Sequence, residues 1–67
     1  QMGYRIKLLR NGVGISQETL ALNANVDRTY VSQLERGISN PSLLILTKIA
    51  KELGTTVSEL TKLSHPG

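Results

Sequence analysis

The chain has 67 residues, with eight Lys and Arg against five Asp and Glu, which gives a formal net charge of +3. This length allows one small domain with a modest core and excludes a second core. The absence of cysteine excludes disulfides and thiolate zinc sites and favours a reducing, cytoplasmic location. No stretch approaches the roughly 20 apolar residues of a membrane span. The small positive charge suits a polyanionic partner without identifying one.

Helical patterns cover the chain, and no alternating run is long enough for a strand. We therefore expect an all-α fold of five helices in a single domain over residues 1–67. The first helix is expected over residues 4–11. It buries Ile6 and Leu9 and stops at the glycine-rich corner of residues 12–14.

Residues 16–36 predict two short helices joined by a tight turn. Ser16 is a good N-terminal cap, so the second helix is expected over residues 17–23. Its apolar residues share one side and form the expected buried face: Leu20, Ala21 and Ala24.

The corner between these helices has its own sequence signals. Asn25 tolerates the left-handed backbone that a sharp turn needs, and Val26 fills the corner from inside. Asp27 then caps the third helix, which is expected over residues 28–36 and ends at Gly37.

The third helix has one polar and one apolar side. At about 100° per residue, its polar side chains fall within an arc of roughly 140°: Arg28, Thr29, Ser32, Gln33 and Arg36. The apolar side consists of Tyr30, Val31 and Leu34. Guanidinium, hydroxyl and amide groups are those that read base edges and phosphates in the DNA major groove. An ordinary solvated helix face is the alternative, and the polar stripe alone favours it.

The last two helices follow a loop over residues 37–41. Ser42 is expected to cap the fourth helix and Gly54 to close it. The residues on its apolar arc are Leu43, Leu46, Ile49, Ala50 and Leu53. Thr56 and Glu59 have the spacing of a capping box, which predicts a fifth helix over residues 57–63.

A longer string of residues runs through these elements in order. It consists of the I-K-L-L-R run ending at Arg10, Ser16-Gln17, Leu20-Ala21, Val26, Val31-Ser32, Leu34-Glu35, Gly37, Asn40-Pro41-Ser42-Leu43, Leu46, Ile49-Ala50, Leu53-Gly54 and Leu60. With this spacing, residues 6–60 resemble the lambda-repressor-like helix-turn-helix family of bacterial and phage regulators, also called the Cro/cI or XRE type. The D-R-T-Y-V-S stretch also resembles controller proteins of restriction-modification systems. Asn25 stands where the family often has glycine.

This resemblance implies a compact five-helix DNA-binding domain whose helix-turn-helix spans about residues 16–36. The side chains that it implies for reading bases are Arg28, Thr29, Ser32 and Gln33. Those implied for phosphate contacts are Gln17, Arg36, Asn40 and Ser42. Arg10 and Glu35 are expected to form an orienting salt bridge between the first and third helices. The implied homodimer contact consists of Thr55, Thr56, Val57 and Leu60.

The resulting hypothesis is a sequence-specific regulator that binds a palindromic double-stranded DNA operator as a homodimer, without a metal or cofactor. An alternative is a protein-interaction or antitoxin-like module with weak, non-specific DNA binding and an apolar patch around Leu44, which falls outside the core arc together with Leu8 and Leu22. An enzyme is disfavoured because the chain has no cysteine and its one histidine, His65, lies in a tail expected to be frayed.

Overall fold

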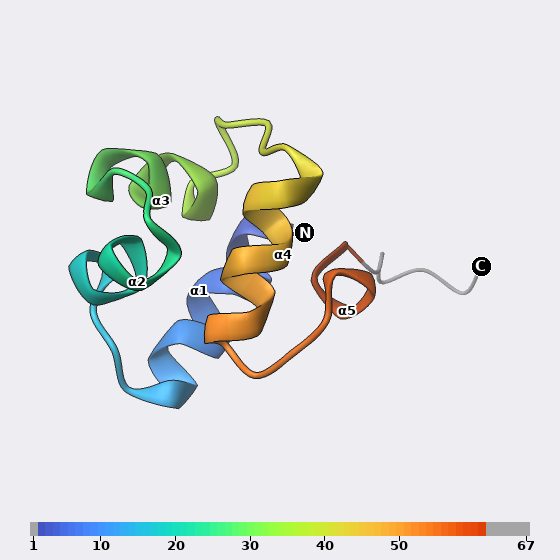
Figure 1. The fold of residues 1–67 in the computed structure, drawn as a ribbon, viewed down its shortest axis with the longest axis horizontal. Coiled ribbons are helices and arrows are strands. Elements are labelled where there is room, and N and C mark those ends of the chain that lie inside the picture. Colours follow the sequence, from blue (N-terminus) through green and yellow to red (C-terminus); the bar gives the residue numbers. More distant parts are fainter. Residues whose placement is uncertain (1, 62–67) are drawn as a thin grey trace.

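The computed structural model describes residues 2–61 of the chain. Its helices are α1 (Met2–Val13), α2 (Gln17–Ala24), α3 (Arg28–Glu35), α4 (Leu43–Glu52) and α5 (Val57–Thr61). No strand occurs within this part of the chain, so the prediction of an all-α fold with five helices is confirmed. In Figure 1, α2 and α3 lie together on one side, α1 and α4 occupy the middle, and α5 lies on the other side. α3 packs on α1 and α2, and α5 packs on α1 and α4.

One apolar core joins all five helices. Its buried residues are Ile6, Leu20, Ala21, Ala24, Val31, Leu34, Leu46, Ile49, Ala50, Leu53 and Leu60. Leu9, Val26 and Tyr30 are partly buried and pack against it. The apolar arcs predicted for α2 and α3 therefore face the interior, as does most of the arc on α4.

Leu43 departs from its prediction, because it is 69% exposed. A helical wheel gives the angle of a residue around the helix axis but not its height along the axis. Leu43 is the first residue of α4, next to the Ser42 cap, so it stands at the very end of the helix. Leu46, one turn later, is buried.

The three predicted N-terminal caps are confirmed. The hydroxyl of Ser16 accepts the N–H of Thr19 at 3.0 Å, and the carboxylate of Asp27 accepts the N–H of Thr29 at 2.9 Å. The hydroxyl of Ser42 accepts the N–H of Ile45 at 3.3 Å. Because a cap satisfies a backbone donor that the helix itself leaves unpaired, each one fixes where its helix begins.

The corner between α2 and α3 also follows its prediction. Asn25 has φ 59° and ψ 45°, the left-handed conformation. The backbone N–H of Val26 donates to the carbonyl of Ala21 at 2.9 Å, and the N–H of Asn25 donates to Leu22 at 3.2 Å. These two bonds close the last turn of α2 and direct the chain into α3.

The predicted end of the first helix at Asn11 is wrong, because α1 continues to Val13 and also begins earlier, at Met2. Gly12 lies inside the helix, and the chain turns at Gly14, which has φ 88°. The N–H of Gly14 and that of Ile15 both donate to the carbonyl of Arg10 and so end the helix. A single helical glycine costs only about 1 kcal/mol relative to alanine, which packing of α1 offsets.

The other described helix ends lie within one residue of their predictions. α3 ends at Glu35 with Arg36 as its cap, and α4 ends at Glu52. The N–H of Glu59 donates to Thr56 at 3.1 Å, as expected at the start of α5. The predicted end of the fifth helix at residue 63 and the tail with His65 lie outside the described residues. No helix within residues 2–61 is long and apolar enough to cross a membrane.

The contact between α1 and α3 depends on a glycine. Gly3 is buried, and a Cβ atom built on it would lie 2.3 Å from the carbonyl oxygen of Leu34 and 2.9 Å from that of Glu35. Real Cβ atoms do not approach so closely, so Gly3 lets the two helix backbones meet. This close approach holds the end of α3 against α1.

Candidate nucleic-acid interface

The polar face of α3 is open to solvent at both ends. Arg28 and Thr29 at its start are exposed, and so is Arg36 at its end. Ser32 and Gln33, between them, are half-buried. The opposite face carries Val31 and Leu34 into the core, so this polar face is held outward by apolar packing.

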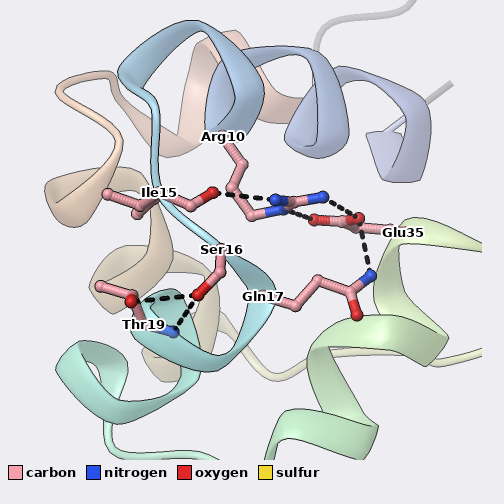
Figure 2. A network of polar contacts seen from close by, with 6 residues as sticks. All are labelled: Arg10, Ile15, Ser16, Gln17, Thr19 and Glu35. Atoms are coloured by element: carbon pink, nitrogen blue, oxygen red, sulfur yellow. Dashed lines mark hydrogen bonds and ion pairs between the residues drawn. The ribbon is translucent and has the colours of Figure 1, made fainter.

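A buried ion pair fixes the C-terminal end of α3, where Glu35 is the last residue of the helix. The Nε atom of Arg10 lies 2.5 Å from Glu35 Oε2, and Arg10 Nη2 donates to Glu35 Oε1 at 3.1 Å. The side chains are only 11% and 3% exposed. Arg10 Nη1 also donates to the carbonyl of Ile15 at 2.8 Å, as Figure 2 shows. Arg10 thus joins α1, the connection to α2 and the end of α3, in the arrangement expected for an orienting pair.

Gln17 takes part in the same network, a contact that the sequence did not predict. Its Nε2 atom donates to Glu35 Oε1 at 3.0 Å (Figure 2), and Gln17 is half-buried. If the Gln17 amide also contacted a DNA phosphate, its N–H donors would be shared between that phosphate and the Glu35 carboxylate. The backbone N–H of Gln17, at the first position of α2, points out of the helix end and remains suited to an anion. No pattern of local spacing indicates a contact between residues 18 positions apart.

The loop from α3 to α4 carries the other predicted phosphate ligands. Asn40 and Ser42 are exposed, as is Arg36 at the beginning of the loop. The Ser42 hydroxyl already accepts a backbone N–H of α4, which leaves its own O–H as a donor. Ser39 in this loop donates its hydroxyl to Gln33 Oε1 at 3.1 Å, another contact that the sequence did not predict.

The four residues of the expected dimer contact differ in their surroundings. Thr55 and Val57 are half-buried and Thr56 is exposed. Leu60, in contrast, is fully buried in the core of its own chain. It lies on α5, which packs against α1 and α4. The assignment of Leu60 to a dimer surface is therefore wrong, whereas the other three remain predictions.

Exposed apolar side chains gather where α4 begins. Leu44 is 65% exposed, as expected, and Ile38 and Leu43 are exposed in the same stretch of chain. Leu8 and Leu22 are also exposed, but they lie on α1 and α2. Within residues 2–61 there is no cluster of three or more His, Cys, Asp or Glu that could hold a metal ion.

Comparisons with known proteins agree on the family. The helix-turn-helix family profile matches residues 6–60. The control protein C.MunI from Mycoplasma is 44% identical over 61 residues, which span 90% of this chain and 82% of that protein.

Two solved structures have the same fold. The restriction-modification controller protein C.AhdI from Aeromonas hydrophila has 44% identity and a TM-score of 0.84, with 88% of this chain and 89% of that chain covered. SinR, a transcriptional regulator of Bacillus subtilis, has been solved in complex with DNA; that structure has 36% identity and a TM-score of 0.88, with 92% of this chain and 100% of that chain covered. These relatives are control proteins and regulators rather than enzymes. The chain belongs to the XRE-type helix-turn-helix family of transcriptional regulators.

Proposed function

We propose that this protein is a sequence-specific regulator that binds a palindromic double-stranded DNA operator as a homodimer, with α3 in the major groove. The observation that carries the proposal is the exposed polar face of α3, held by the buried pair of Arg10 and Glu35. A helix whose orientation is fixed can place its side chains on base edges reproducibly. The DNA complex of the related SinR supports DNA as the ligand. A cytoplasmic, nucleoid-associated location is part of this proposal.

The proposed base-reading residues differ in chemistry. Arg28 is long and exposed at the start of α3, and its guanidinium can donate two parallel bonds to O6 and N7 of guanine. Thr29 offers a methyl group to thymine or a hydroxyl to a base edge. Ser32 and Gln33 supply a further hydroxyl and amide on the next turn.

The proposed phosphate contacts flank this helix on both sides. The free N–H groups at the start of α2 attract an anion, with Gln17 beside them. Arg36, Asn40 and Ser42 are exposed in and around the loop after α3. Contacts of this kind fix the position of α3 on the duplex without reading sequence.

A dimer would set the spacing of the half-sites. Recognition helices about 34 Å apart, one turn of DNA, require half-sites centred about 10 base pairs apart. We propose Thr55, Thr56 and Val57 as part of the twofold contact, since their side chains are exposed or half-buried. Burial of this surface would also add stability to a small domain.

Binding is expected to weaken steeply as salt is added. Each phosphate neutralised by a cationic group contributes about 0.9 to the slope of log affinity against log salt concentration. Arg36 of each subunit would neutralise a phosphate and Arg28 brings a second cation per subunit into the groove, so the slope should be at least about 1.8. A fluorescence anisotropy titration of a selected duplex at several salt concentrations measures it. A flat dependence would count against a DNA role.

Variants at Arg28 and Arg36 are expected to separate base reading from phosphate binding. If Arg28 binds guanine, Arg28→Ala should cost about 1 to 3 kcal/mol of binding free energy on the specific site and relax preference at two mirrored base pairs. Arg36→Ala should weaken binding to all sequences alike.

The operator for this experiment comes from selection of bound sequences out of a random duplex pool. Affinities of both variants are then measured against every single-base change in the selected duplex. A palindromic consensus supports both specificity and symmetry. Equal weakening of every duplex by Arg28→Ala would make this side chain a phosphate contact instead.

A second candidate is a protein-interaction module with the same fold. The observation that favours it is the exposed apolar stretch of Ile38, Leu43 and Leu44. This function predicts that no consensus emerges from the random pool. It also predicts that Leu44→Ser abolishes partner binding while the weak DNA binding remains.

A further inference from the structure

Ser39 makes a specific contact with a proposed base-reading residue. Its hydroxyl donates to Gln33 Oε1 at 3.1 Å, and both side chains are half-buried. The turn after α3 explains how residues six positions apart meet. Gly37 has φ 77°, and the N–H of Ile38 donates to the Gln33 carbonyl at 3.0 Å. These features fold the loop back over the last turn of α3 and place Ser39 beside Gln33.

The contact gives the oxygen and the nitrogen of the Gln33 amide different roles. The oxygen is an acceptor and is engaged by Ser39. The Nε2 atom carries two N–H donors, and among residues 2–61 no side chain or carbonyl accepts from it. The amide therefore presents donors to a ligand.

The bases differ in what they require of such an amide. Adenine offers an acceptor at N7 and a donor at N6, so a bidentate contact needs both the oxygen and the nitrogen of the amide. Guanine offers two acceptors, N7 and O6, and thymine offers an acceptor at O4. The bond from Ser39 takes one of the two lone pairs of Oε1 and fixes the direction of the amide, so Nε2 with its two donors is the end left for a base edge. Guanine and thymine O4 offer acceptors and match that end better than adenine, which needs both ends of the amide.

We propose that Ser39 is a specificity-determining residue of the DNA site. By holding Oε1 of Gln33, it directs Nε2 to the base edge and disfavours adenine at the base pair that Gln33 contacts. Ser39 itself touches no base in this arrangement and acts as a positioning residue. The inference rests on the proposed function of α3 as the base-reading helix.

The strength of the contact limits the size of the effect. One hydrogen bond between neutral groups has a small net value in water, which corresponds to a factor of about two to ten in an equilibrium constant. The hydrogen bond from Ser39 cannot change the base preference of Gln33 by more than the free energy of that bond. Ser39 should therefore change the ratio of affinities for guanine and adenine duplexes by about two- to tenfold.

The test uses the whole chain and a duplex selected from a random pool. Gln33→Ala first identifies the mirrored base pairs whose preference depends on Gln33. Wild-type protein and Ser39→Ala are then titrated with four versions of this duplex, one for each base at these positions. Ser39→Thr retains the hydroxyl and should behave like wild type. Thr47→Ala is the matched control, because Thr47 is exposed and its hydroxyl donates to the Leu43 carbonyl of its own helix. Melting curves establish that each variant is folded.

The expected result is that Ser39→Ala raises affinity for the adenine duplex relative to the guanine or thymine duplex by about two- to tenfold. Preferences at the other base pairs and the salt slope should stay unchanged, which separates positioning of Gln33 from a general loosening of the loop. The inference is overturned if the wild-type protein prefers adenine at this base pair. It is also overturned if Ser39→Ala has the same base preferences as the wild-type protein. In either case a consensus with Arg28-dependent pairs leaves the proposed function standing. A pool without any consensus overturns both.

Discussion

Replacement of Arg10 by Met is expected to lower the free energy of unfolding by about 3 to 5 kcal/mol, the range for a buried ion pair that loses one partner. The Glu35 carboxylate would keep its burial but lose both donors that Arg10 supplies. Among residues 2–61 only Gln17 Nε2 would still donate to it, and one neutral amide does not offset the lost hydration of a carboxylate. The Ile15 carbonyl would lose the Arg10 donor as well.

A thermal melt at fixed protein concentration measures this effect. For a domain of 60 to 100 residues, 1 kcal/mol corresponds to about 4 to 8 °C in melting temperature, so a fall of at least about 12 °C is expected. Lys7→Met is the matched control, because Lys7 is an exposed cation on the same helix and should change stability by no more than about 0.5 kcal/mol.

A double variant separates the cost of leaving Glu35 charged and unpaired from the cost of losing the packing of the Arg10 side chain. In Arg10→Met with Glu35→Met, neither charge of the pair remains, so much of the stability should return. Binding to the selected duplex should not return with it, if the pair sets the orientation of α3. A melting temperature of Arg10→Met equal to that of wild type would contradict the buried pair and with it the packing of α1 on α3.

The helix-turn-helix was predictable because its signals are local. Ser16 and Asp27 each cap a donor two or three residues away, and Asn25 adopts the left-handed conformation by itself. Such interactions depend on the chain within one turn and need no knowledge of the rest of the fold. The family resemblance then supplied what local signals lack, in particular the pairing of Arg10 with Glu35 across 25 residues.

The sequence failed where a side chain's surroundings depend on how the helices meet. Leu43 and Leu60 carry the same side chain, yet one is exposed and the other is in the core. This difference in exposure depends on where each residue lies along its helix, α4 or α5. The spacing of apolar residues in the sequence does not show where that position falls relative to the other helices. The contacts of Gln17 with Glu35 and of Ser39 with Gln33 were missed for the same reason. Each one joins residues brought together by a turn or by packing.

The glycines of α1 show this limit most clearly. Gly3 and Gly12 lie in the same helix, and the sequence does not distinguish them by function. Gly3 is buried against the backbone of α3, whereas a Cβ at Gly12 would meet nothing within 4 Å. Identical substitutions at these positions therefore predict opposite effects.

Gly3→Ala is expected to lower the free energy of unfolding by about 3 kcal/mol, at the upper end of the usual cost of overpacking. The added Cβ would lie 2.3 Å from the Leu34 carbonyl oxygen, and because this atom belongs to the backbone, no side-chain rotation relieves the contact. The helices would have to separate, which also strains the ion pair between Arg10 and Glu35.

Gly12→Ala should instead stabilise the protein by about 0.5 to 1 kcal/mol, because alanine favours a helix over glycine and has open space there. Since both variants make the same change in helix propensity, the difference between their melting temperatures isolates the contact with α3. Equal melting temperatures would mean that α1 and α3 do not meet at Gly3, and the orientation proposed for the polar face of α3 would lose its support.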